Sequence, residues 1–163
     1  MATQFHSLPS AWSVLGLSPH RLMLTRRTDM RTPASARHHA EAGLLEQIDR
    51  ALQTLHIHGR HSVFLVDTAC GDGRLLIHAA RRARALGFVA IDAKGFDPAP
   101  EHIAFATAAA GTVHDPAIGF AFTLLPTGGT LPIDDGEVDL VIGPRDAETE
   151  RLLGEYGTLV HRS

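Results

Sequence analysis

The sequence has little cysteine and little lysine, and it lacks any long apolar run. Cys70 is the only cysteine in the 163 residues, so an intrachain disulfide is impossible and a reducing intracellular compartment is expected. No apolar run approaches the ~18 residues that span a bilayer, which predicts a cytoplasmic protein without a membrane segment. The net charge of −3 provides no global signature of nucleic-acid binding.

The N-terminal residues differ in composition from the rest of the chain. Up to residue 40 there are several arginines and one acidic residue, Asp29, and prolines recur without any sustained hydrophobic period. This predicts an irregular, disordered extension over residues 1–33, with one short helix near residues 12–17. An organelle transit peptide and an upstream start codon are alternative interpretations of the same segment.

From residue 34 onward, helical and strand-like hydrophobic patterns alternate. Helices are predicted at 34–58, 74–86, 101–110 and 147–156, and strands at 62–66, 93–96 (with an extension at 88–91), 118–124, 138–142 and 158–161. Such alternation is typical of an α/β domain with a mostly parallel sheet. We therefore expect one three-layer α-β-α, Rossmann-like domain over residues 34–163.

The turn after the first predicted strand indicates a ligand site. Gly71 and Gly73 lack a Cβ, so a ligand can lie against the backbone at the carboxyl end of the strand. The dinucleotide fingerprint requires a third glycine where Leu76 stands, and the Gly-Lys-Ser/Thr of a phosphate-binding P-loop is absent. Both of these nucleotide-binding motifs are therefore disfavoured.

Three segments resemble class I S-adenosylmethionine-dependent methyltransferases. The run Asp67-Thr68-Ala69-Cys70-Gly71-Asp72-Gly73 resembles motif I, with Ala69 in place of the first glycine, where a positive φ would be strained. The segment 95–101 resembles motif II, whose acid binds the ribose hydroxyls. That acid would be Asp97, with Asp92 as the alternative. The segment 131–142 resembles the family's passage into the fourth strand.

The resemblance implies S-adenosylmethionine as cofactor and methyl transfer as the reaction, with a small-molecule acceptor favoured. The cofactor-binding residues would be Asp67, Ala69, Cys70, Gly71, Gly73, Asp97, Pro98 and Thr127. No catalytic residue is assigned, because methyl transfer depends mainly on positioning. A catalytically silent module that pairs with another chain, a different nucleotide-binding domain, and a plain α/β domain with a glycine turn are the alternatives.

Several features depart from the family pattern. The acid that accepts a hydrogen bond from the adenine amino group is missing, and Thr127 stands nearest to its position. Only about twenty residues follow Ile142, so we expect a C-terminally truncated member whose fourth strand is an exposed sheet edge, open to homo-oligomer formation. No metal site is predicted. His56, His58 and His61 are interpreted as helix-end residues, and Cys70 as a packing residue.

Overall fold

The computed structural model describes residues 33–161, and the side chains from residue 41 onward. The predicted N-terminal extension, with its short helix near residues 12–17, lies outside the described residues except for Pro33. The chain divides into two units, Met1–Ala36 and Arg37–Ser163, and the second contains the sheet. Among the described helices, none is both long enough and apolar enough to cross a membrane.

Helices and strands alternate along the described chain, as the hydrophobic pattern predicts. The helices are α1 (Pro33–Ile57), α2 (Arg74–Leu86), α3 (Pro100–Ala110) and α4 (Ala147–Arg151). The strands are β1 (Ser62–Asp67), β2 (Ala90–Asp97), β3 (Ile118–Leu124), β4 (Val138–Gly143) and β5 (Leu153–His161).

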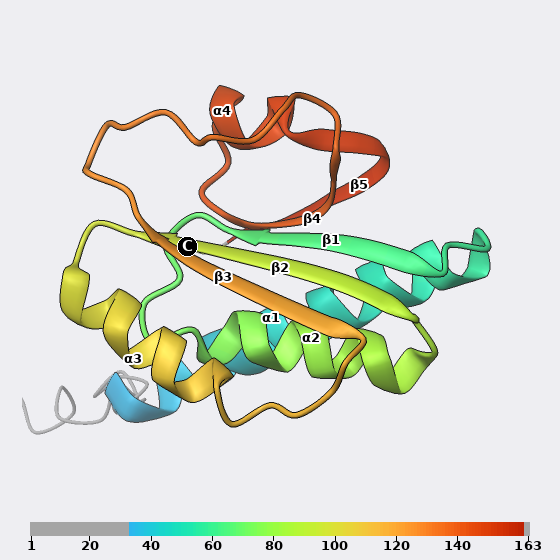
Figure 1. Cartoon of the computed structure of the whole chain (residues 1–163), viewed down its shortest axis with the longest axis horizontal. Helices are drawn as coiled ribbons and strands as arrows, with labels where there is room; N and C mark the ends of the chain where they lie inside the picture. Colours follow the sequence, from blue (N-terminus) through green and yellow to red (C-terminus); the bar gives the residue numbers. More distant parts are fainter. Residues whose placement is uncertain (1–32, 162–163) are drawn as a thin grey trace, which may run out of the picture. The chain divides into compact units, whose positions relative to one another are not determined.

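The strands form one five-stranded sheet in the order β3-β2-β1-β4-β5 (Figure 1). Each of the four strand pairs is parallel. The predicted α/β class with a parallel sheet is therefore confirmed. Because β1 lies between β2 and β4, the chain reverses its direction of winding next to β1, which is where ligands bind in open α/β sheets.

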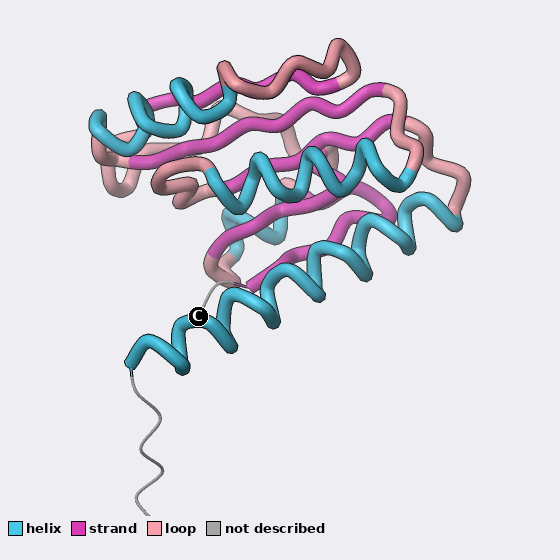
Figure 2. Tube along the Cα trace, turned by 90° about the horizontal axis from the view of Figure 1, so that it is seen from below, coloured by secondary structure: helices cyan, strands magenta, loops and turns pink. Residues whose placement is uncertain are grey.

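The three long helices cover one face of the sheet. Figure 2 shows α1, α2 and α3 in front of the strands, with the short α4 behind them. The core on the long-helix side includes Ile48, Leu52 and Leu55 of α1, each fully buried, at the three- and four-residue spacing that predicted this helix. Leu76, Ala79, Ala80 and Ala83 of α2 continue the same core.

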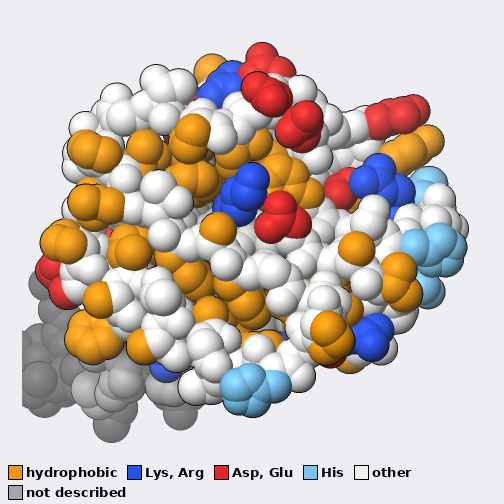
Figure 3. Space-filling view, viewed as in Figure 1, with side chains coloured by type: hydrophobic (Ala, Val, Ile, Leu, Met, Phe, Trp, Pro, Cys, Tyr) orange, Lys and Arg blue, Asp and Glu red, His pale blue; other side chains and the backbone are white. Residues whose placement is uncertain are grey.

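The layer that covers the opposite face of the sheet is much smaller than the layer of α1, α2 and α3. A separate cluster of apolar side chains fills the opposite face between the sheet, α4 and the loop after β3; it comprises Val66, Phe96, Leu131, Ile133, Val138, Val141 and Leu152. No long helix covers this face within the described residues. In Figure 3, hydrophobic side chains gather over the strands around a few charged groups.

The second strand is longer and more regular than predicted. Residues 90–97 form one continuous strand in place of the predicted strand at 93–96 with a separate extension at 88–91. Gly95 pairs with Asp67 of β1 on one side and with Phe122 of β3 on the other, so the sheet holds it in register. Phe88, predicted as the start of an extension, lies before the strand and is fully buried in the core.

The prediction for residues 147–161 is wrong in its boundaries. The helix ends at Arg151 and the strand already begins at Leu153. The backbone carbonyls of Arg151 and Leu152 accept hydrogen bonds from Gly136 N (2.9 Å) and Val138 N (2.8 Å). These tertiary bonds, together with burial of Leu152, favour an extended chain where local periodicity favours a helix.

The fourth strand is not a sheet edge, contrary to the prediction. β5 pairs with β4 from Leu140↔Thr158 to Gly143↔His161, and a bulge separates these pairs from Val138↔Leu153. Every residue of β4 is buried. The predicted exposed apolar edge is absent because β5 is nine residues long, and β5 is the outer strand of the described sheet.

Candidate functional site

The turn from Thr68 to Gly73 joins β1 to α2 at the carboxyl end of the sheet. Its backbone is tied to both neighbouring strands: Thr68 N donates to Ile142 O of β4 (3.0 Å), and Cys70 N donates to Phe96 O of β2 (2.8 Å). These bonds hold the turn at the point where the winding reverses. The motif-I segment therefore lies where a ligand crevice is expected.

The glycines of this turn adopt conformations that other residues avoid. Gly71 has φ +54° and Gly73 has φ +76°, both in the left-handed region. A Cβ on Gly73 would also lie 2.8 Å from the Cβ of Ala106 on α3. Ala69, by contrast, is not among residues with positive φ, because every such residue in the described chain is a glycine. The backbone strain that a positive φ would cause at Ala69 is therefore absent.

Asp67 lies beneath the turn. Asp67 is fully buried, and its Oδ1 accepts a hydrogen bond from Ala69 N at 3.1 Å. The carboxylate therefore stabilises the path of the backbone in the turn. Cys70 is also buried, in agreement with its interpretation as a packing residue.

Asp97 connects the end of β2 to the motif turn. Its Oδ2 accepts a hydrogen bond from Gly71 N (2.9 Å), and its Oδ1 accepts from Ala99 N (2.9 Å) and from His102 Nδ1 (2.9 Å). Burial raises the pKa of Asp97, but the two backbone N–H groups and His102 outweigh that effect and hold its pKa below the ordinary value of 3.8. Asp97 is consequently a carboxylate at neutral pH.

A cavity of about 270 Å³ opens beside this carboxylate. Of the predicted binding residues, Ala69, Asp97, Pro98 and Thr127 line it, whereas Asp67, Cys70, Gly71 and Gly73 do not. The cavity is near the lower end of small-molecule sites. The other residues that line it are Thr68, Leu125, Pro126, Gly128, Gly129, Leu131, Pro144, Asp146, Glu148 and Thr149.

The charges at this cavity are all of one sign. Asp97, Asp146 and Glu148 line it, and its lining among the described residues contains no lysine, arginine or histidine. Arg151, outside the lining, lies 3.8 Å from Glu148 and offsets part of this charge. The remaining acids oppose a phosphate, because like charges in a partly desolvated site repel each other. The site therefore suits a ligand with a positive centre better than a nucleotide phosphate.

Two of these acids belong to a segment that the sequence reasoning did not select. Asp146 caps α4, since its carboxylate accepts a hydrogen bond from Thr149 N (2.9 Å). Glu148 accepts from Leu131 N (2.9 Å) and so ties α4 to the loop after β3. The start of this helix at residue 147 was predicted, but a capping residue does not indicate which cavity it lines, so the sequence offered no signal for this placement.

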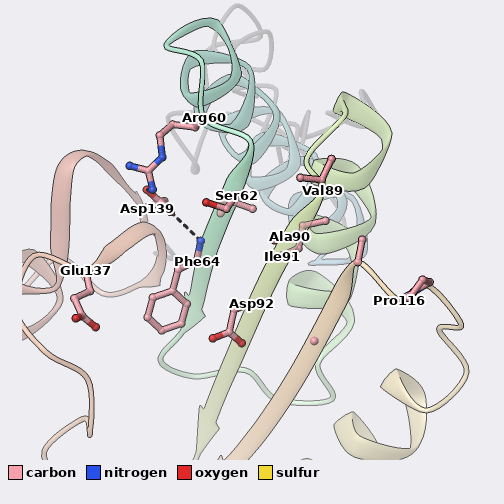
Figure 4. Close-up of a pocket in the computed structure, with 13 residues that line it drawn as sticks. Arg60, Ser62, Phe64, Val89, Ala90, Ile91, Asp92, Pro116, Glu137 and Asp139 are labelled. Atoms are coloured by element: carbon pink, nitrogen blue, oxygen red, sulfur yellow. Dashed lines mark hydrogen bonds and ion pairs between the residues drawn. The ribbon is translucent and has the colours of Figure 1, made fainter.

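Asp92, the alternative ribose-binding acid, lies elsewhere. It belongs to the first half of β2, its side chain is 57% exposed, and it does not line the cavity beside Asp97. It lines a larger groove of about 450 Å³ at the opposite ends of the strands, with Phe64 and Glu137 (Figure 4). The two candidate acids therefore lie five residues apart on β2 and line different cavities.

The larger groove is held together by structural contacts. Asp139, only 5% exposed, accepts a hydrogen bond from Phe64 N (2.8 Å) and pairs with Arg60 (2.8 Å). Lys94 lies over the Phe64 ring, 4.8 Å from its centroid. In an open α/β sheet this is the end of the strands away from the ligand crevice.

The histidines near the end of α1 make structural contacts. His58 Nδ1 lies 2.7 Å from Thr54 O, and its ring stacks on Tyr156 at 4.8 Å. The His56 ring packs near Phe88 at 5.7 Å. Among the described residues, no three histidine, cysteine, aspartate or glutamate side chains converge as a metal site.

The solved structures that are similar to this chain include methyltransferases. No protein-family model and no curated protein matches the sequence. A candidate class I S-adenosylmethionine-dependent methyltransferase from Listeria monocytogenes is 26% identical, with a TM-score of 0.48 over 62% of this chain and 29% of that one. A candidate S-adenosyl-L-methionine-dependent methyltransferase from Methanococcus maripaludis is 19% identical, with a TM-score of 0.46 over 77% and 61%.

A third solved structure, the plantazolicin methyltransferase BpumL in complex with SAH, is 14% identical. Its TM-score is 0.46, and the match covers 75% of this chain and 46% of that one. The chain therefore spans between 29% and 61% of the lengths of these three proteins.

Proposed function

We propose that this chain binds S-adenosylmethionine in the cavity beside Asp97 and belongs to a methyltransferase that acts on a small molecule. The observation that carries the proposal is the buried Asp97 carboxylate, which ends β2, contacts the motif turn through Gly71 and lines the cavity. A carboxylate can accept hydrogen bonds from both hydroxyls of a ribose.

The residues present fit this cofactor. Gly71 is in the left-handed conformation, and a Cβ built there would meet nothing within 4 Å, so the space beside this part of the turn is open to a flat or extended ligand. The acidic lining suits the positive sulfonium centre. Thr127, in the loop after β3, would lie on the adenine side, where a hydroxyl or backbone group replaces the family's acid.

The contribution of this chain to the reaction would be positioning. Asp97 and Pro98 would hold the ribose, and the turn around Ala69 would lie against the rest of the cofactor. When bound, S-adenosylmethionine supplies an electrophilic methyl group that a nucleophile displaces from sulfur. Such a transfer depends on alignment and exclusion of water, so no side chain of this site is assigned a proton-transfer role.

Binding is tested by calorimetric titration with S-adenosylmethionine and S-adenosylhomocysteine, with ATP and NAD as phosphate-bearing comparisons. We expect binding of the first two and little of the others. Asp97→Asn should weaken S-adenosylhomocysteine binding by about 10- to 100-fold, since it removes hydrogen bonds to a charged group. Asp92→Asn is the matched control on the same strand and should bind like the wild type.

Two results would contradict the proposal. If neither S-adenosylmethionine nor S-adenosylhomocysteine bound at millimolar concentrations, S-adenosylmethionine would be excluded as the cofactor. A larger loss in Asp92→Asn than in Asp97→Asn would move the ribose site to the other end of the strand.

The acceptor is tested by incubating the protein with methyl-labelled cofactor and a metabolite extract. The label should appear in the small-molecule fraction. Transfer of label only to macromolecules would contradict the proposal of a small-molecule acceptor.

A further inference from the structure

His102, in the first turn of α3, contacts the proposed ribose acid. Its Nδ1 lies 2.9 Å from Asp97 Oδ1. The two side chains differ in exposure, because His102 is 48% exposed whereas Asp97 is 8% exposed. His102 is therefore a solvent-accessible group in contact with an almost buried carboxylate.

The Asp97 carboxylate has little accepting capacity left. A carboxylate offers about four lone-pair sites on its two oxygens. Oδ1 already accepts two hydrogen bonds, from Ala99 N and His102, and Oδ2 accepts one, from Gly71 N. One site remains, whereas a ribose diol that donates both hydroxyl protons needs two.

We propose that His102 occupies the position on Asp97 Oδ1 that the second ribose hydroxyl requires, and that cofactor binding displaces the imidazole. The inference rests on the proposed function. It makes His102 a residue that regulates cofactor affinity by competition for Asp97.

The other two donors are harder to displace. Ala99 N precedes α3, and Gly71 N belongs to a turn whose neighbour Cys70 is hydrogen-bonded to β2. Moving either donor would disturb a helix start or the motif turn. The imidazole, by contrast, is 48% exposed and needs only a side-chain rotation into solvent.

The competition should depend on pH. A histidine gains charge as the pH falls from about 8 to about 5, and the imidazolium binds a carboxylate more strongly than the neutral ring. A lower pH therefore favours the state in which His102 is bonded to Asp97, and it weakens cofactor binding. The other ionisable groups that line the cavity with Asp97 are Asp146 and Glu148. Glu101 precedes His102 on α3, Asp72 and Arg74 of the motif turn pair with each other at 2.9 Å, and β3 contains no ionisable residue.

The test is calorimetric titration of the wild type, His102→Ala and His102→Gln with S-adenosylhomocysteine at pH 5.5 and 8.0. 5′-Methylthioadenosine serves as a second probe, because it carries the diol but no group that titrates in this range. His78→Ala, an exposed histidine on α2, is the matched control.

At pH 5.5, His102→Ala should bind both probes about three- to tenfold more tightly than the wild type. Wild type and His78→Ala should gain affinity between pH 5.5 and 8.0, whereas both His102 variants should show no such gain. Equal urea midpoints for the wild type and His102→Ala would exclude a general change of fold.

A weaker affinity of His102→Ala at both pH values would overturn the inference, since His102 would then help to orient Asp97. Persistence of the wild-type pH dependence in His102→Ala would overturn it as well. In either case the proposed function stands, because the cofactor binds. Failure of every variant to bind at either pH would overturn both the proposed function and this inference.

Discussion

Replacing Gly95 by alanine tests how closely the motif turn and β3 approach the second strand. Gly95 is a buried strand residue without a positive φ, so alanine meets no backbone penalty there. Its Cβ, however, would lie 2.6 Å from Cδ1 of Phe122 and 3.0 Å from Cβ of Cys70. Both contacts are too short, and two packed side chains must shift to relieve them.

The expected effect is a fall in the free energy of unfolding of about 1–3 kcal/mol, the usual range for one extra carbon in a well-packed core. Gly119→Ala is the matched control, since its Cβ would meet only Ile91 O, at 3.9 Å. That control should be neutral or stabilise by up to about 1 kcal/mol, because alanine restricts the unfolded chain.

Urea unfolding followed by far-UV circular dichroism measures both variants, and an unchanged m-value allows their midpoints to be compared directly. Phe122→Leu removes the ring that a Cβ at position 95 would meet. The double variant Gly95→Ala/Phe122→Leu should therefore lose less stability than the sum of the single losses. Equal midpoints for Gly95→Ala and Gly119→Ala would refute the reasoning.

Three further predictions concern stability. Leu52→Ala should lower the free energy of unfolding by about 2–5 kcal/mol in the same urea assay, because Leu52 is fully buried in the α1 core; a loss below 1 kcal/mol would contradict that packing. Thr149→Val should cost about 1–3 kcal/mol, since it leaves Pro144 O, now bonded to Thr149 Oγ1 at 2.7 Å, without this donor, and a neutral effect would count against that bond. The lowered pKa of Asp97 stabilises the folded state above its unfolded value near 3.8, and this contribution is lost as the pH falls through the folded pKa. The stability difference between wild type and Asp97→Asn should therefore shrink below about pH 4, and a difference independent of pH would exclude the linkage.

Oligomer formation through the sheet remains a proposal, with a different strand as its site. The outer strand of the described sheet is β5, so an association through the strand edge would involve β5. Light scattering at increasing protein concentration measures the mass, and a constant monomer mass would contradict this proposal.

Local sequence was enough to predict the elements whose signals are local. The spacing of Ile48, Leu52 and Leu55 predicted α1, the apolar run after Ser62 predicted β1, and Gly71 and Gly73 predicted the turn between β1 and α2. These signals depend on side-chain periodicity and on backbone freedom, which are properties of a short segment.

Tertiary contacts decided the features that local pattern left open. β5 replaced the predicted helical turns because the backbone of residues 151–152 bonds to Gly136 and Val138, across the fold. The structure also separated Asp97 from Asp92, placed Glu148 at the cavity and brought His102 against Asp97. The sequence by itself determined the alternating elements and the motif turn. Which acids lie at that turn was determined only by the assembled sheet, because it brings together residues that are far apart in the chain.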